Sequence, residues 1–169
     1  MSTNGAVVRL GEGDLDWLRG HLADQAVNNG GGGGDERAAA WFAAGDPDTY
    51  DLDGASLGVH FLLTGTERGG EGPLSFVANE AFGAPVRWAS GHGRAFEPAA
   101  VAAIADAIEA TAARLVRQRL ESAALATLPP FSSRRLGDDE KEWLLAVLQG
   151  LMTFLRHAAD DGVALLVTL

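Results

Sequence analysis

His60 is the residue of this sequence with the clearest potential for chemistry. If residues 53–64 form a helix, Ser56, His60 and Thr64 lie four residues apart and share one face of it. This face is interpreted either as one wall of a small-molecule or catalytic pocket, or as a polar stripe that bonds to its neighbours. A serine nucleophile needs an activating base and a strained, exposed turn, and Ser56 lacks that Gly-x-Ser-x-Gly setting. No catalytic residue is therefore assigned.

A second group of polar residues surrounds a predicted turn at residues 91–93. Trp88, Ser90, His92 and Arg94 alternate along the two flanking segments, so they could present one face to a partner or ligand. Trp88 and His92 are candidate binding residues for this reason. No two of the four histidines have the spacing of a His-Glu-x-x-His zinc site, and no metal site is predicted.

Four carboxylates crowd residues 46–53 (DPDTYDLD) and suggest calcium binding. In the register of an EF-hand loop, Thr49 falls at the first position and His60 at the twelfth, where carboxylates are required. The EF-hand is therefore rejected, and a looser cation site is the less favoured alternative. Asp51 or Asp53 is instead expected to cap the helix that follows, and both are kept as candidate binding residues.

The glycine-rich segments and the absence of cysteine argue against the common cofactor-binding motifs. Residues 65–72 (GTERGGEG) have the spacing of a phosphate-binding loop, but Glu71 stands where that loop needs a lysine. Gly91 and Gly93 lack the third glycine of a dinucleotide fingerprint. The sequence contains no cysteine, which excludes disulfides, thiolate catalysis and iron–sulfur clusters. No cofactor is predicted.

The elements that must position these residues follow an irregular order of strand and helix patterns. The pattern predicts strands at 5–10, 86–89, 94–96 and 163–169, and helices at 14–27, 38–44, 53–64, 73–82, 98–120 and 138–159. Two of these segments have an alternative, since 59–63 also fits a strand and 38–44 also fits a turn. Such an order is not the regular alternation of a doubly wound sheet, so the fold class is α+β. We expect a single compact domain over 1–169, with a small mixed or antiparallel sheet packed with several helices. The glycine run at 28–35 is expected to be a disordered loop.

Charge and length narrow the class of protein. The chain has 169 residues, the length of one domain, and a net charge of −10. Residues 1–84 hold 13 acids and 4 arginines, which gives this half a charge of −9. Such a surface disfavours nucleic acid and anionic membranes but suits a basic protein partner. Neither a signal peptide nor a run of 18 apolar residues is visible, so a cytoplasmic bacterial protein is expected.

Several segments together resemble those of a known family. The resembling segments are Asp51-Leu52-Asp53, the run His60–Gly65 (HFLLTG), Gly91-x-Gly93 with Phe96 and Pro98, the apolar last helix, and Asp161-Gly162 before the final strand. The chain from Val7 to Val167 therefore resembles the YfbM-like family, domain of unknown function 1877. This resemblance implies a compact α+β domain with a helical 53–64 segment. It implies no established activity.

Two functional hypotheses remain after these exclusions. The leading one is a non-enzymatic protein-binding module, immunity-like or regulatory, whose acidic surface recognises a basic protein. The alternative is a small-molecule-binding protein or enzyme with a cleft near His60, lined also by Thr64, Trp88 and His92. The helix predicted at 138–159 is apolar on almost all sides, so it is either central to the core or a homodimer interface, which is compatible with both hypotheses.

Overall fold

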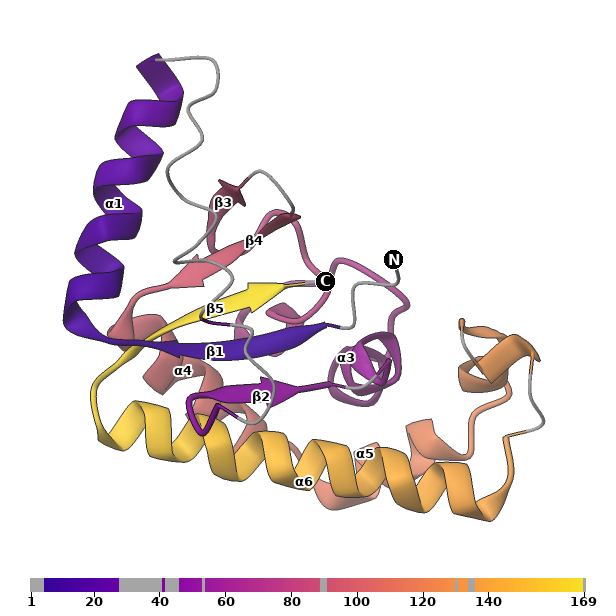
Figure 1. Ribbon diagram of the computed structural model, residues 1–169. Coiled ribbons are helices and arrows are strands. Elements are labelled where there is room, and N and C mark those ends of the chain that lie inside the picture. Colours follow the sequence, from indigo (N-terminus) through magenta and orange to yellow (C-terminus); the bar gives the residue numbers. More distant parts are fainter. Residues whose placement is uncertain are drawn as a thin grey trace.

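The computed structural model describes residues 5–27, 41, 46–52, 54–88, 91–129, 131–133 and 136–168 (Figure 1). Its strands are β1 (Ala6–Leu10), β2 (Thr49–Asp51), β3 (Ala84–Trp88), β4 (Gly91–Phe96) and β5 (Ala164–Thr168). Its helices are α1 (Glu12–Val27), α3 (Ser56–Thr64), α4 (Pro98–Glu109), α5 (Ala113–Leu120) and α6 (Asp138–Asp160). Short 3₁₀ turns occupy Pro73–Ser75, Leu125–Thr127 and Phe131–Ser133.

The strands form one five-stranded sheet in the order β2-β1-β5-β4-β3. Every neighbouring pair is antiparallel, with Val7 opposite Val167 and Arg94 opposite the same residue on the other side. One compact domain with helices beside an antiparallel sheet confirms the predicted α+β class. The last strand of the domain, β5, is also the central strand of the sheet.

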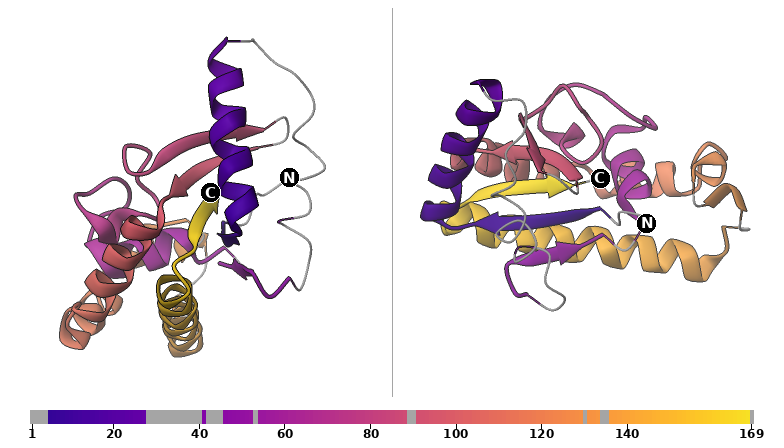
Figure 2. Two further views of the ribbon diagram at one scale, coloured as in Figure 1. Left: turned by 90° about the vertical axis from the view of Figure 1, so that its left-hand side faces the viewer. Right: turned by 45° about the horizontal axis from the view of Figure 1, so that its top comes forward.

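Each face of the sheet carries its own hydrophobic cluster. Val7, Leu165 and Val167 point to the face covered by α3, α4 and α6, where the larger cluster lies. The alternating residues Val8 and Leu166 point to the other face and form a smaller cluster with residues of α1 and with Trp41. Figures 1 and 2 show α6 and α4 against one side of the sheet and α1 on the opposite side.

The central helix α3 sits tightly in the larger cluster. A Cβ at Gly58 would lie 2.8 Å from the ring of Phe131 and 2.9 Å from Leu144, so only glycine allows this packing. The helix ends at Gly65, whose φ of +80° favours glycine. Arg119 of α5 donates from Nη1 to the carbonyl oxygens of Leu62 (2.8 Å) and Leu63 (2.6 Å).

Helix α6 has one fully buried stripe. That stripe consists of Leu144, Leu148, Leu151, Leu155 and Ala158. The other large apolar side chains of α6 are partly buried against the same cluster. Among the described residues, the large hydrophobic side chain that remains exposed is Leu115 of α5, at 38%. The apolar side chains of α6 therefore pack within the domain. A homodimer through α6 stays a prediction.

Several predicted boundaries were wrong. Asp51 does not cap a helix, because it belongs to β2, a strand that the sequence pattern did not predict. Ala55 occupies the N-cap of α3 with no side-chain hydrogen bond, and α1 begins at Glu12, before Asp14. The helix predicted at 98–120 is two helices, α4 and α5.

One more predicted helix is shorter than expected, and other predicted segments lie outside the described residues. Of the helix predicted at 73–82, only the turn Pro73–Ser75 forms. The glycine run at 28–35 and Asp53 lie outside the described residues, as does all of the helix predicted at 38–44 except Trp41.

Candidate functional site

Strand β4 supplies one wall of a cavity. Strand alternation places His92 and Arg94 on the same face of the sheet as Val167 of β5. Between them, a Cβ at Gly93 would lie only 2.5 Å from the carbonyl oxygen of Val167. Glycine at this position therefore permits the close approach of β4 to β5, on which the wall depends.

The opposite wall is the segment that follows α3. Gly69 and Gly70 have φ angles of +71° and +100°, which glycine adopts without strain. Gly69 donates its N–H to the carbonyl oxygen of Ala78 (3.0 Å), and the Asn79 amide donates to that of Gly70 (2.9 Å). These bonds hold the segment against residues 76–80 and fix the backbone that directly follows Arg68.

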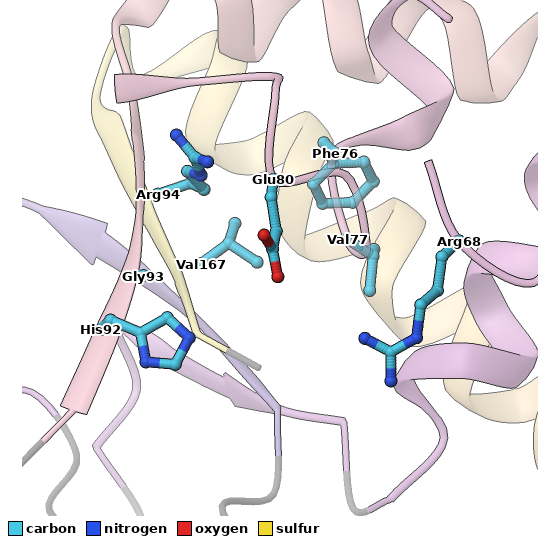
Figure 3. Close-up of a pocket in the computed structure, with 8 residues that line it drawn as sticks. All are labelled: Arg68, Phe76, Val77, Glu80, His92, Gly93, Arg94 and Val167. Atoms are coloured by element: carbon cyan, nitrogen blue, oxygen red, sulfur yellow. The ribbon is translucent and has the colours of Figure 1, made fainter. Parts of the chain in front are cut away.

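Between these walls lies a cavity of about 240 Å³. Its lining residues are Arg68, Phe76, Val77, Glu80, His92, Gly93, Arg94 and Val167, and we call it the charged pocket. Figure 3 shows the Arg68 guanidinium, the Glu80 carboxylate and the His92 ring directed toward the open centre. Arg94 lies on the β4 wall, and Phe76, Val77 and Val167 supply buried apolar surface.

The charged groups of this pocket are not neutralised by one another. Within the described part of the chain, none of Arg68, Glu80 and Arg94 belongs to a salt bridge. Arg94 uses one nitrogen, Nη1, to donate to the carbonyl oxygen of Gly83 at 3.2 Å. The remaining donors of the two guanidinium groups and the Glu80 oxygens are therefore available to a ligand.

Three other arginines in the described part of the chain form ion pairs. Arg9 is bonded to Asp161 at 2.5 Å, and Arg19 is bonded to Glu97 at 2.7 Å. Arg156 of α6 joins Asp106 (3.0 Å) and Glu109 of α4 (2.6 Å). The unpaired charges of the pocket contrast with these structural ion pairs.

His60 lies close to the pocket but does not line it. Its side chain is fully buried in α3, with Nε2 3.5 Å from the hydroxyl of Thr66. Burial lowers the pKa of His60, the nearby Gly69 backbone opposes that shift, and the positive charge of Arg68 adds to it. Nδ1 has no partner at hydrogen-bonding geometry among the described residues. The His60 ring is therefore next to the segment 66–69, which carries Arg68.

The structure separates the candidate residues into three places. Thr64 bonds to the His60 carbonyl oxygen (2.8 Å) and contacts the hydroxyl of Thr66 (2.9 Å), so these residues form one polar cluster. His92 belongs to the charged pocket. Asp51 lies on β2, at the far edge of the sheet from β3.

Two other candidates are described incompletely. The backbone of Trp88 ends β3, and its side chain lies outside the described residues, as does all of Asp53. Arg68 and Glu80 were not selected from the sequence, and Arg94 was noted only for its place in the alternating face. The signal available for Arg94 was this alternation. The tertiary fold brings Arg68 and Glu80 close to β4, and their spacing in the sequence gives no sign of this proximity.

The chemistry available in the charged pocket is recognition of charge and hydrogen bonding. Guanidinium groups bind carboxylates and phosphates, and a carboxylate accepts bonds from amines, amides or hydroxyls. Among the described residues, no group of three or more His, Asp or Glu side chains is arranged to hold a metal ion. In the same part of the chain, no helix has the length and apolarity needed to cross a membrane.

Comparison with known proteins gives a family and a fold. The family described as "Domain of unknown function (DUF1877)" matches residues 3–168. The chain is similar to the crystal structure of a protein of unknown function, YfbM, from Escherichia coli, with 18% identity and a TM-score of 0.69. That similarity covers 98% of this chain and 99% of the other. No curated protein matches the chain.

Proposed function

Because this chain belongs to the DUF1877 family, a domain of unknown function, we propose its function from its own geometry: it binds a small anionic molecule in the charged pocket. The observation that carries the proposal is the presence of Arg68 and Arg94 in one cavity without a salt-bridge partner in the described residues. In a chain with a net charge of −10, such a local excess of positive charge favours an anionic ligand.

The dimensions of the pocket support a ligand of metabolite size. Its volume of about 240 Å³ lies below the roughly 300–1,000 Å³ typical of sites for drug-sized molecules. Buried Phe76, Val77 and Val167 supply an apolar surface on which a short hydrocarbon segment can pack. A small carboxylate or phosphate ester with a short carbon chain fits this combination.

Binding, rather than turnover, suits the side chains present. Among the described lining residues, none carries a hydroxyl or thiol nucleophile. His92 and Glu80 are both exposed at the pocket, so a ligand that displaces water can bond to their polar atoms. We therefore propose a binding protein that senses or buffers the concentration of a small anion.

The proposal is tested by titrating small carboxylates and phosphate esters into the protein and recording amide NMR shifts. We expect shifts to cluster at residues 66–80 and 92–94. Replacing Arg68 with alanine should weaken binding by about 1.5–3 kcal/mol, the range for a hydrogen bond to a charged group, or roughly tenfold or more in the dissociation constant.

The matched control is Arg117→Ala, because Arg117 is an exposed arginine of α5 that does not line the pocket. It changes the net charge by the same amount. If Arg117→Ala weakens binding as much as Arg68→Ala does, the effect is one of overall charge and the proposed site is wrong. An absence of binding by the whole set of anions would also reject the proposal.

Recognition of a basic protein by the acidic half of the chain stays a separate prediction. One observation favours its location: Asp48 and Asp161 both contact Arg9, and Asp46 accepts the N–H of Asp48, so a third carboxylate lies beside this ion pair. Capture of a defined basic protein that weakens as salt increases, and that is lost in Asp46→Asn/Asp48→Asn, would support it. Unchanged capture by this variant would reject that surface.

A further inference from the structure

We infer that the ligand of the charged pocket is amphoteric: it carries an anionic group for Arg68 and Arg94 and a cationic amino group for Glu80. This inference rests on the proposed function, because it uses the same cavity. It is carried by a separate observation, the position of the Glu80 carboxylate between the two arginine-bearing walls (Figure 3).

Glu80 is the feature that a purely anionic ligand does not explain. Its carboxylate is directed into the cavity, and it forms no salt bridge to either arginine within the described part of the chain. A ligand with negative charge at both ends would place one end beside this carboxylate and be repelled. A ligand with an ammonium group satisfies the carboxylate with a charge-assisted hydrogen bond.

The two walls impose a polarity on the bound molecule. Arg68 belongs to the segment after α3, Arg94 belongs to β4, and Glu80 projects between them over the apolar surface of Val77 and Val167. The anionic end therefore binds toward a guanidinium group while the amino end binds at Glu80. The short carbon segment between them packs on the apolar surface. Amino acids and related amino carboxylates have this chemistry.

His92 is compatible with either end of such a ligand. Imidazole nitrogens can take part in hydrogen bonds with either charged group. His92 therefore adds a hydrogen bond without deciding the charge of the ligand. Glu80 is the group that separates amphoteric from purely anionic ligands, and its replacement is the decisive change.

The test compares four ligands with four-carbon chains: butanoate, succinate, 2-aminobutanoate and 4-aminobutanoate. Each is titrated into the folded protein and its dissociation constant measured by amide NMR. We expect at least one of the two amino carboxylates to bind about tenfold more tightly than butanoate and succinate. In Glu80→Gln, this preference should disappear, and succinate should bind more tightly than it does to the original protein.

Glu71→Gln is the matched control, since Glu71 is an exposed glutamate that does not line the pocket. It should leave all four dissociation constants unchanged. If butanoate and succinate bind through Arg68 but neither amino carboxylate is preferred, the amphoteric inference is wrong and anion binding stands. If no ligand binds, or Arg68→Ala weakens none of them, both proposals fail. Because Glu80 is exposed, the glutamine variant is expected to fold, and its thermal midpoint verifies this.

Discussion

At the scale of single residues, the buried His60 makes the stability of the protein depend on pH. Its pKa in the folded state lies below the ordinary value of 6.5, chiefly because of burial. The unfolded chain therefore binds more protons than the folded chain as the pH falls below 6.5, so protonation favours unfolding. The contribution of His60 to stability is complete above that pH and is lost as the pH falls toward the folded-state pKa.

We expect the free energy of unfolding, measured with urea, to be lower near pH 5.5 than near pH 7.5. His60→Gln should reduce this difference, because glutamine does not titrate. The exposed His157→Gln is the control and should leave the difference unchanged. An equal pH dependence in His60→Gln and the original protein would mean that other groups govern acid unfolding.

Gly58 provides a second residue-scale prediction. Alanine favours helix over glycine by about 1 kcal/mol, but its Cβ here would lie 2.8 Å from the Phe131 ring. Overpacking of a core costs about 1–3 kcal/mol, so Gly58→Ala should lower the free energy of unfolding despite the gain in helix propensity. Gly20→Ala is the matched control, since nothing lies within 4 Å of the added Cβ on α1. Equal effects of the two substitutions in denaturant unfolding would contradict this packing.

The candidate site shows what spacing along the chain can and cannot predict. His92 and Arg94 share a face because strand alternation operates over neighbouring residues. The sequence pattern indicated this alternation, but the turn it predicted at 91–93 was wrong, because these residues belong to β4. Glu80 and Arg68 reach the same cavity through bonds such as Gly69 to Ala78, which join segments that local patterns treat separately. A resemblance limited to a domain of unknown function supplied no site residues either. Only the tertiary fold brings these charged side chains together.

At the scale of elements, one guanidinium group joins α5 to the end of α3 by hydrogen bonds. Arg119 donates to two carbonyl oxygens in the last turn of α3, where helix carbonyls lack intrahelical partners. Burial lowers the pKa of Arg119, yet the group is held at the negative end of the helix dipole. We expect Arg119→Met to reduce the free energy of unfolding by about 1–2 kcal/mol, because methionine keeps the packing but not the donors.

Arg117→Ala, on the exposed side of α5, is the comparison for Arg119→Met. Both variants remove one positive charge, so a difference between their urea midpoints isolates the hydrogen bonds to α3. If the two variants have the same midpoint, the Arg119 bonds contribute nothing measurable to stability.

Most elements could be predicted where their sequence pattern is long or strongly alternating. The final helix and the first and last strands were correct to within one or two residues. The three-residue strand β2 was missed, because its edge pairing with β1 is decided by tertiary contacts such as the Tyr50 hydroxyl on the Val147 carbonyl oxygen (2.8 Å). The break between α4 and α5 was missed because alanine-rich sequence favours helix throughout, and only a change in apolar phase marked it.

At the scale of the whole molecule, the two hydrophobic clusters differ in extent. The larger cluster joins β1, β5, α3, α4 and α6, whereas the smaller one holds α1 and Trp41 to the other face of the sheet. Elements with less buried apolar surface open at lower free energy. We therefore expect the backbone amides of α1 to exchange with deuterium faster than those of α4 and α6, as measured by mass spectrometry.

A variant in the smaller cluster tests this order. Leu18→Ala removes a buried side chain of α1, so it should speed exchange in α1 while leaving α6 nearly unchanged. Uniform acceleration across all helices would show that the two faces unfold as one cooperative unit.

The place of β5 in the sheet has a consequence for how the protein is made. Residues 164–168 pair with both β1 and β4, so they join the β2-β1 pair to the β4-β3 hairpin. A ribosome synthesises all the other strands first, and until β5 emerges the inner edges of β1 and β4 have no partner. The nascent chain therefore has an unpaired edge on β1, and later a second one on β4, until β5 emerges, and such edges can associate with other chains. Pairing of both inner edges waits for those five residues.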